Sequence, residues 1–167
     1  MGFRPSGWLD TIMIAPTRHL VAELNARARA HRLDHSAAAS EVSLADGNRA
    51  SIGDMIITRT NDRRLRLTAT DWVKNSDRWT ITAVSEHGDL TVRHTRSHRT
   101  VRLPADYVRE STGLGYATTI HAAQSVTTDT MHGLAASHVV RVSRRQPGVR
   151  DYRARWACTL CATLPTQ

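Results

Sequence analysis

The stretch RWTITAVSEHGDLTVRHT, residues 78–95, alternates β-branched and apolar residues with polar ones on both sides of a turn at Gly88 and Asp89. Alternation with a period of two is typical of a strand that buries one face. A Gly-Asp pair between two such runs indicates a hairpin. The stretch therefore predicts two antiparallel strands, and the residues around it extend the pattern.

Residues 50–109 continue this alternation in both directions. The segment DMIITRT at 54–60 and the segment RTVRLP at 99–104 have the same mixture of β-branched and polar residues. Four or five short strands at this spacing predict a small antiparallel barrel or meander. Turn-forming residues separate the expected strands at 61–62, 75–77, 87–89 and 97–98.

The loop between the first two of these strands is basic and has aromatic residues beside it. Trp72 and Trp79 flank the turn at 75–77, and we expect both in the barrel core, with stacking on nucleic-acid bases as the alternative. The arginines of the loop are candidates for contacts with phosphate, and the other interpretation is that they form a solvated basic face. The candidate residues of this loop are Arg59, Asn61, Arg63, Arg64 and Arg66.

The N-terminal part has a different pattern. TIMIA at 11–15 is a short apolar run of strand type, and Thr17 can cap the helix that RHLVAELNARARAHRL predicts at 18–33. A strand, a tight turn and a helix begin an α/β layer. Residues 37–49 are small, polar and unpatterned, so we expect a loop or a weak short helix there.

After the expected barrel the α/β pattern returns. LGYATTI at 114–120 predicts a strand, and Thr118 or Thr119 can cap a helix through IHAAQSV at 120–126. The strands at 11–15 and 114–120 are short, nearly continuous apolar runs, each followed at once by a helix. This pattern is typical of strands buried on both faces, so we expect the two to be neighbours in one sheet.

The charge of the chain favours an anionic partner. Lys and Arg number 23 against 15 acidic residues, the net charge is +8, and Lys74 is the one lysine. Arginine binds phosphate through two parallel hydrogen bonds and stacks on bases, so nucleic acid is the expected partner. A basic surface with no such partner is the alternative.

Other classes of site have little support in the sequence. Cys158 and Cys161 form a lone Cys-x-x-Cys without a second pair of ligands, so we expect free thiols and no metal site. No apolar run is long enough to span a membrane, and no signal-peptide segment opens the chain. We therefore expect a cytoplasmic protein with no membrane partner.

Two segments resemble a known family. YATTIHAAQSVTTD at 116–129 and IAPTRHLVAELNARARA at 14–30 resemble superfamily 1 DNA helicases, above all RecD-like enzymes and the helicase half of TraA/TrwC-type conjugative relaxases. The resemblance implies an α/β fold, a partial RecA-like motor domain with an inserted SH3-like β-barrel. The implied divisions are a first RecA-like part at 1–48, the barrel at 49–109, a return segment at 110–137 and a divergent or disordered basic tail at 138–167.

The resemblance also implies roles for single residues. Thr119, His121 and Gln124 would contact single-stranded DNA, and Ser125 and Asp129 would face the nucleotide. Ser125 stands where the family has Gly, which departs from the pattern of a close backbone contact with phosphate. The alternative is that Thr119 and His121 serve only as cap and packing residues.

The rest of an ATP site is missing from the sequence. There is no Gly-x-x-x-x-Gly-Lys-Ser/Thr loop, no pair of acids for magnesium and no closing arginine motif. We therefore expect no catalytic residue and no cofactor bound by this chain alone, although the parent family uses ATP and magnesium. The expected function is that of a truncated second motor domain that keeps its contacts with single-stranded DNA. A Walker-containing motor domain on another chain would complete it. The alternative is a stand-alone nucleic-acid-binding module built on an SH3-like barrel.

Overall fold

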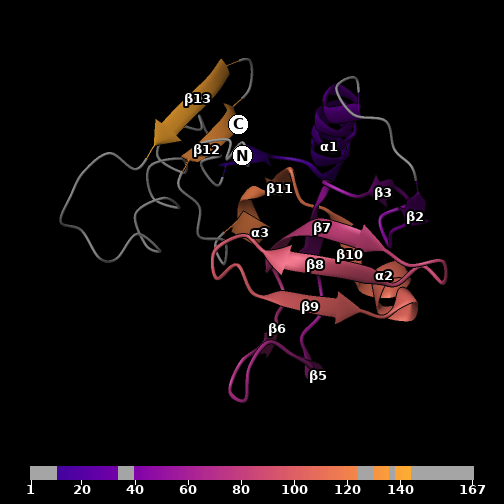
Figure 1. Ribbon diagram of the computed structural model, residues 1–167. Coiled ribbons are helices and arrows are strands. Elements are labelled where there is room, and N and C mark those ends of the chain that lie inside the picture. Colours follow the sequence, from indigo (N-terminus) through magenta and orange to yellow (C-terminus); the bar gives the residue numbers. More distant parts are fainter. Residues whose placement is uncertain (1–10, 34–39, 124–129, 136–137, 144–167) are drawn as a thin grey trace, which may run out of the picture. The chain divides into compact units, whose positions relative to one another are not determined.

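The computed structural model describes residues 11–33, 40–123, 130–135 and 138–143. The chain divides into two compact units, one formed by residues 1–21 with 118–167 and the other by residues 22–117. Each unit contains its own sheet (Figure 1). We call them the first unit and the second unit.

A five-stranded antiparallel sheet forms the centre of the second unit. Its strands follow the order β10-β4-β7-β8-β9. β7 and β8 pair from Trp79 opposite His94 to Val84 opposite Leu90, which confirms the hairpin predicted over residues 78–95. The bounds are β4 Met55–Thr58, β7 Arg78–Val84, β8 Leu90–His94, β9 Thr100–Leu103 and β10 Thr112–Leu114.

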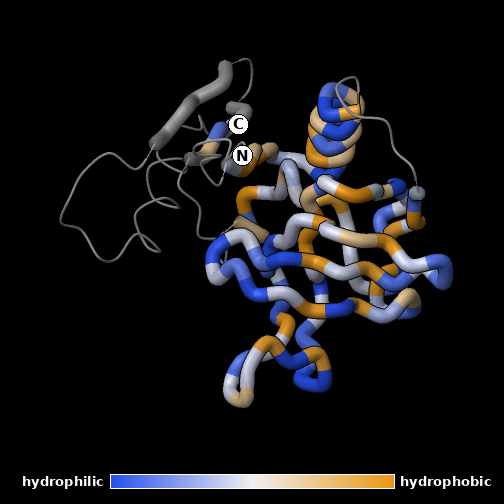
Figure 2. The backbone as a smooth tube through the Cα atoms, viewed as in Figure 1, coloured by the Kyte–Doolittle hydropathy of each residue, from blue (hydrophilic) through white to orange (hydrophobic). Residues whose placement is uncertain are grey.

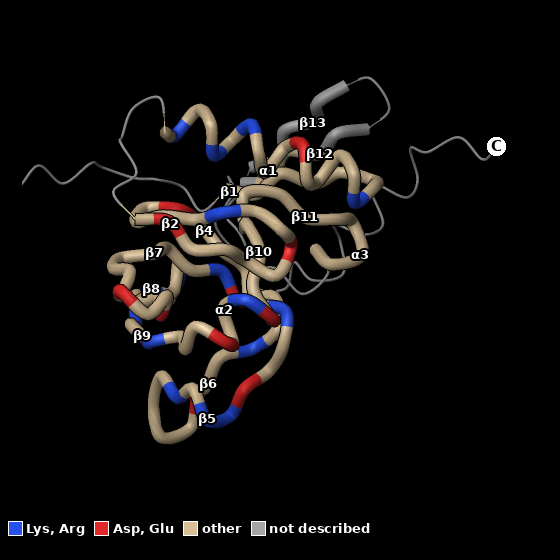
Figure 3. The backbone as a smooth tube through the Cα atoms, turned by 90° about the vertical axis from the view of Figure 1, so that its right-hand side faces the viewer, with Lys and Arg blue, Asp and Glu red and all other residues tan. Residues whose placement is uncertain are grey.

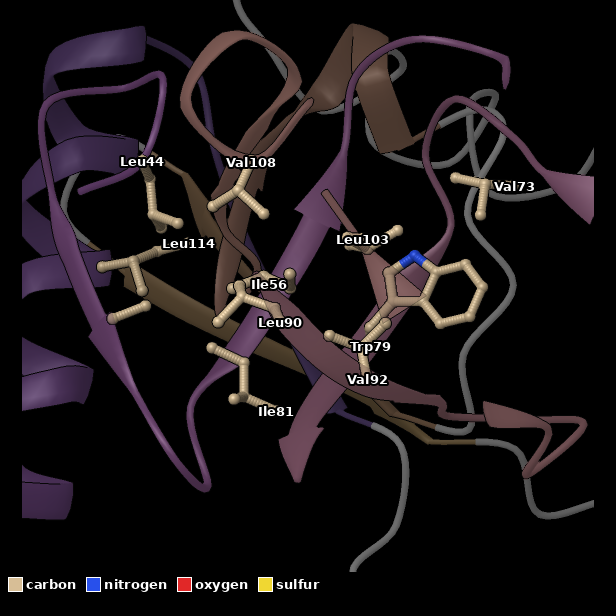
Figure 4. Close-up of a cluster of buried hydrophobic side chains, with 11 residues drawn as sticks. Leu44, Ile56, Val73, Trp79, Ile81, Leu90, Val92, Leu103, Val108 and Leu114 are labelled. Atoms are coloured by element: carbon tan, nitrogen blue, oxygen red, sulfur yellow. The ribbon is translucent and has the colours of Figure 1, made fainter. Parts of the chain in front are cut away.

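The inner face of this sheet is the main hydrophobic core. Apolar residues alternate with polar ones along its strands (Figure 2), and the apolar ones meet at the centre, where the Trp79 indole lies beside Leu103 and Val92 (Figure 4). Trp79 is fully buried, and its indole nitrogen donates to Thr58 Oγ1 at 3.3 Å. The prediction that Trp79 belongs to the core is confirmed.

Two short hairpins and a helix complete the second unit. The hairpin of β2 (Glu41–Ser43) and β3 (Arg49–Ser51) turns at Gly47, whose φ is 80°. The prediction of a loop or weak helix at 37–49 is therefore wrong for the residues of β2 and β3. Strands of three residues are too short to show an alternation of apolar and polar residues. The other elements are β5 Asp62–Arg66, β6 Trp72–Val73 and α2 Ala105–Ser111.

Helix α1 (Arg18–Leu33) has the predicted extent and start. The hydroxyl of Thr17 accepts a hydrogen bond from the Leu20 amide at 3.3 Å, so Thr17 is the expected cap. Within the second unit, Asn25 is buried on this helix, and its Oδ1 accepts from the Ala117 amide at 2.8 Å.

An ion-pair cluster around Asp54 ties the C-terminal half of α1 to the five-stranded sheet. The Asp54 carboxylate is fully buried and accepts from Arg29 Nε at 3.2 Å, from Arg32 Nε at 2.7 Å and from the Tyr116 hydroxyl at 2.7 Å. The Ser51 amide adds a bond of 2.7 Å. We call these five residues the Asp54 cluster.

A four-stranded sheet forms the first unit, in the order β11-β1-β12-β13. β1 is parallel to β12 and β12 is antiparallel to β13. β1 and β11 are neighbours, so the predicted adjacency of two strands about 100 residues apart is confirmed. The bounds are β1 Thr11–Ala15, β11 Ala117–Thr119, β12 Thr130–Ala135 and β13 His138–Ser143.

The strand expected at 114–120 is divided between the two sheets. Residues 112–114 pair with β4, whereas residues 117–119 join β1. The division falls at Gly115, whose amide donates to the Met55 carbonyl at 2.8 Å and whose carbonyl accepts from Arg78 Nε at 3.2 Å. Because these hydrogen bonds use the backbone of Gly115, the pattern of hydrophobic residues does not predict where the strand is divided.

Gly115→Ala should lower the free energy of unfolding by about 1–3 kcal/mol, because a new methyl group would clash with the backbone of β4, against which Gly115 packs. A Cβ at Gly115 would lie 2.8 Å from the carbonyl carbon of Ile56, and backbone cannot move aside cheaply. Gly47→Ala is the control, since a Cβ there meets nothing within 4 Å and only the positive φ opposes it. Urea unfolding of both variants measures the difference, and a Gly115→Ala protein as stable as the wild type would contradict the account.

Two other expectations need correction. The helix expected at 120–126 is α3 (Ile120–Ala123), and residues 124–126 lie outside the described residues. The divergent or disordered tail was expected at 138–167, but residues 138–143 form β13, and residues 144–167 lie outside the described residues. The described residues form a mixed α/β structure with several sheets, and they do not show the RecA-like arrangement that the resemblance implies.

Candidate nucleic-acid interface

The segment from Arg59 to Asn75 projects from the five-stranded sheet as the β5–β6 hairpin (Figure 1), and basic residues gather along it (Figure 3). We call this segment the basic hairpin. It contains five basic residues against the two acids Asp62 and Asp71. The basic residues are Arg59, Arg63, Arg64, Arg66 and Lys74.

The basic hairpin is fixed at its base and at its tip. At the base, the Asn75 amide donates to Asn61 Oδ1 at 2.8 Å, and the Tyr107 hydroxyl donates to the Thr60 carbonyl at 2.5 Å. At the tip, the Leu67 amide donates to the Asp71 carbonyl at 2.9 Å. Leu65 and Leu67 also pack against the buried core. The hairpin therefore presents its polar side chains from an ordered backbone.

Trp72 lies on the basic hairpin with two cations over its ring. The guanidinium carbon of Arg63 is 5.0 Å from the ring centroid, and Nζ of Lys74 is 5.5 Å from it. Both distances are in the range of cation–π attraction. Trp72 is half-buried and is not among the core residues, so the expectation that it belongs to the core is wrong.

Both acids of the basic hairpin are held by neighbouring cations. Arg64 donates to Asp62, and this hydrogen bond lowers the pKa of the Asp62 carboxyl. Lys74 Nζ is 2.6 Å from Asp71 Oδ1, which lowers the pKa of Asp71 and raises that of Lys74. Arg63 and Arg66 are exposed and make no salt bridge with any carboxylate in the described part of the chain. Their charge is available to a ligand.

The predicted site residues belong to different units of the chain. Arg59, Asn61 and Arg63 come together on the basic hairpin. Asn61 has a structural role there, because its side chain accepts the hydrogen bond from the Asn75 amide that joins the two ends of the hairpin. Thr119 and His121 belong to the first unit instead. Gln124, Ser125 and Asp129 lie outside the described residues.

Thr119 performs the role that the simpler interpretation gave it. Its hydroxyl accepts from the Ala122 amide at 3.3 Å, as a cap does. His121 is exposed on α3. Thr118, the other expected cap, is buried, and its hydroxyl has no hydrogen-bond partner among the described residues.

Two features of the structure were not anticipated from the sequence. Lys74 was not named as a site residue, although its place two residues after Trp72 in a turn-rich segment was a usable signal. The Asp54 cluster joins residues up to 87 positions apart, from Arg29 to Tyr116, and no local pattern marks it.

Other kinds of site find no support in the described residues. No group of three or more His, Cys, Asp or Glu residues there is arranged to hold a metal ion. None of the helices described is long and apolar enough to cross a membrane. The basic hairpin is therefore the surface on which a functional proposal can rest.

Comparison with known proteins shows what part of the second unit resembles. Residues 42–113 match the family model described as the Rv2311 SH3-like barrel domain. Two curated relatives, the uncharacterized proteins Rv2311 and MT2373 of Mycobacterium tuberculosis strains, are each 32% identical over 81 residues. The match covers 48% of this chain and 47% of each relative, so the chain spans about half the length of the curated relatives it matches.

These matches support an SH3-like barrel and leave its function open. Residues 42–113 are similar to the Rv2311-type SH3-like barrel domain, and the β5–β6 hairpin at 62–73 lies inside the matched range. The SH3-like barrel that the resemblance implies is thus supported by an independent match. Neither match carries evidence for a helicase.

Proposed function

We propose that the chain binds single-stranded nucleic acid without sequence preference, as a binding module built on the SH3-like barrel. The observation that carries the proposal is the partly exposed Trp72 ring with Arg63 and Lys74 over it. Proteins that bind single strands combine aromatic side chains, on which bases stack, with cations that follow the phosphates. The basic hairpin has both in one short segment.

The cations over Trp72 do not prevent a base from stacking there. A cation over a partly exposed ring contributes about 0.5–1 kcal/mol. A base stacked on an aromatic side chain contributes about 1–3 kcal/mol. A base can therefore replace one of the cations, and the displaced cation remains beside the phosphates of the strand.

Trp72→Ala should weaken binding to oligothymidylate by about tenfold or more, because one stacking interaction is lost. Trp72→Phe keeps an aromatic face and should retain most of the affinity. Fluorescence anisotropy with a labelled 20-nucleotide strand measures both, and Arg27→Ala on α1, whose arginine pairs with Glu23, is the control for charge elsewhere.

Two results would overturn the proposal. The first is wild-type protein that fails to bind the strand at low salt. The second is equal binding of poly-glutamate, which has the charge of a polyanion but no bases, with no dependence on Trp72. That second result would assign the basic hairpin to an acidic protein partner.

The second candidate function is a fragment of a helicase motor domain, and one observation favours it. β1 and β11 are neighbours in one sheet, as the resemblance implies for the parts on either side of an inserted barrel. In this case strand binding would depend on Thr119 and His121 of the first unit. DNA affinity lost in His121→Ala but unchanged in Trp72→Ala would support this candidate over the barrel module.

A further inference from the structure

The turn between β8 and β9 is a second strongly basic surface of the barrel. Residues 90–105 contain no acidic residue and include Arg93, Arg96, Arg99 and Arg102. Arg102 is held by Asp89. Arg96 and Arg99 are exposed and make no salt bridge within the part of the chain that the structure describes.

The backbone of this turn is held in place by its own residues. His94 Nδ1 accepts from the amides of Arg96 at 3.3 Å and Ser97 at 3.1 Å. The His94 amide donates to the Arg99 carbonyl at 2.8 Å, and His98 has a φ of 56°. The His94 ring in turn packs edge-on against Trp79, with 4.9 Å between ring centroids. The backbone of the turn is therefore ordered, and it carries two exposed guanidinium groups, those of Arg96 and Arg99, that make no salt bridge in the described part of the chain.

The turn lies close to the basic hairpin. β5 and β9 are in contact within the second unit. The charge of Arg99 also reaches Asp71, beside Trp72, where it helps to lower the pKa of that carboxyl. A strand that stacks on Trp72 thus has the Arg99 side of the turn within its electrostatic range.

We infer that Arg96 and Arg99 form a second phosphate-binding subsite, so that the barrel binds an extended single strand passing from Trp72 to the β8–β9 turn. The inference rests on the proposed function and adds to it a second subsite, which requires a strand of several nucleotides. A strand several nucleotides long reaches both surfaces, whereas a mononucleotide reaches only one. Arginine suits this role because its planar fork binds phosphate oxygens in pairs.

The test compares the Arg96→Ala/Arg99→Ala double variant with wild type. With a 20-nucleotide strand, the double variant should bind about tenfold more weakly at low salt. The slope of log affinity against log salt should become shallower by about 1.4, because each phosphate contact on a single strand contributes about 0.7. The Arg96→Lys/Arg99→Lys variant keeps the charges and should keep the slope. Arg27→Ala is again the control.

A short ligand separates this subsite from Trp72. Binding of a mononucleotide, followed by tryptophan fluorescence, should be the same in wild type and in the double alanine variant. If the 20-nucleotide strand binds with dependence on Trp72 but with an unchanged slope in the double variant, the second subsite is wrong and the proposed function stands. If wild type binds no strand, both fail. Thermal melting confirms that each variant is folded before binding is measured.

Discussion

Asp54→Ala should lower the free energy of unfolding by about 3 kcal/mol or more. Removing one partner of a buried ion pair costs about 3–5 kcal/mol, because the remaining charge stays desolvated. Arg29 and Arg32 keep 16% and 22% of their side-chain surface exposed, so water can offset part of that cost. Urea unfolding followed by circular dichroism measures the effect.

Two variants show whether the loss comes from the buried cluster. Tyr116→Phe removes the hydrogen bond that the hydroxyl donates to Asp54 and the one that it accepts from the Met55 amide, and it should cost about 1–2 kcal/mol. Asp106→Ala removes an exposed carboxylate paired with Arg109 on α2 and should change stability by less than 0.5 kcal/mol, as surface ion pairs do. Equal stability losses in Asp54→Ala and Asp106→Ala would contradict the structural role of the cluster.

The Asp54 cluster also sets the pH range of this stabilisation. Burial on its own raises the pKa of Asp54, but hydrogen bonds from Arg32 and Tyr116 outweigh it and hold the pKa below the usual 3.8. The stabilisation is therefore fully present above pH 3.8 and is lost as the pH falls through the lower folded value. Burial and Asp54 raise the pKa of Tyr116 from 10.0 to about 12, so its contribution is present below pH 10 and is lost as the pH rises toward 12.

The affinity for single-stranded nucleic acid should fall by about 100-fold between 50 mM and 200 mM salt. The basic hairpin and the β8–β9 turn together offer contacts for about five phosphates, and each contributes about 0.7 to the slope of log affinity against log salt. The expected slope is then about −3 to −4. Anisotropy titrations with an unstructured oligothymidylate at four salt concentrations give this slope.

Charge removal on the basic hairpin should make that slope shallower. Arg59→Ala/Arg63→Ala should reduce its magnitude by about 1.4, whereas Arg27→Ala, on a different part of the second unit, should leave it unchanged. An affinity that does not vary with salt would exclude phosphate contacts as the source of binding.

The barrel was predictable because its strands are amphipathic. The alternation over 78–95 specifies both strands and the turn between them, but it does not mark the shift in register between Ile81 and Ala83. The hairpin of β2 and β3 was missed because its strands have three residues each, and Leu44 and Ala50 are buried by core residues distant in the sequence. When an apolar residue is buried by residues far away in the sequence, a stretch of about ten residues around it shows no pattern that predicts the burial.

The candidate site was predictable only in part. The arginines of the basic hairpin stand out by composition, and Arg63 is exposed, although it lies on strand β5 and not on the expected loop. The pairing of Arg63 with Trp72 depends on the fold of the hairpin, which brings together side chains nine positions apart. The two tryptophans have similar sequence surroundings, yet Trp79 is buried and Trp72 is at the surface, because only Trp79 faces the inner side of the sheet.

The most direct test of the proposed interface is an NMR titration of the 15N-labelled chain with oligothymidylate. The indole N–H signal of Trp72, assigned with the Trp72→Phe variant, should shift together with the amides of residues 61–75. The indole signal of Trp79, which is buried and bonded to Thr58, should stay in place. A titration that shifts only residues 118–123, or that leaves the Trp72 signal unmoved while the strand binds, would contradict a nucleic-acid interface on the basic hairpin.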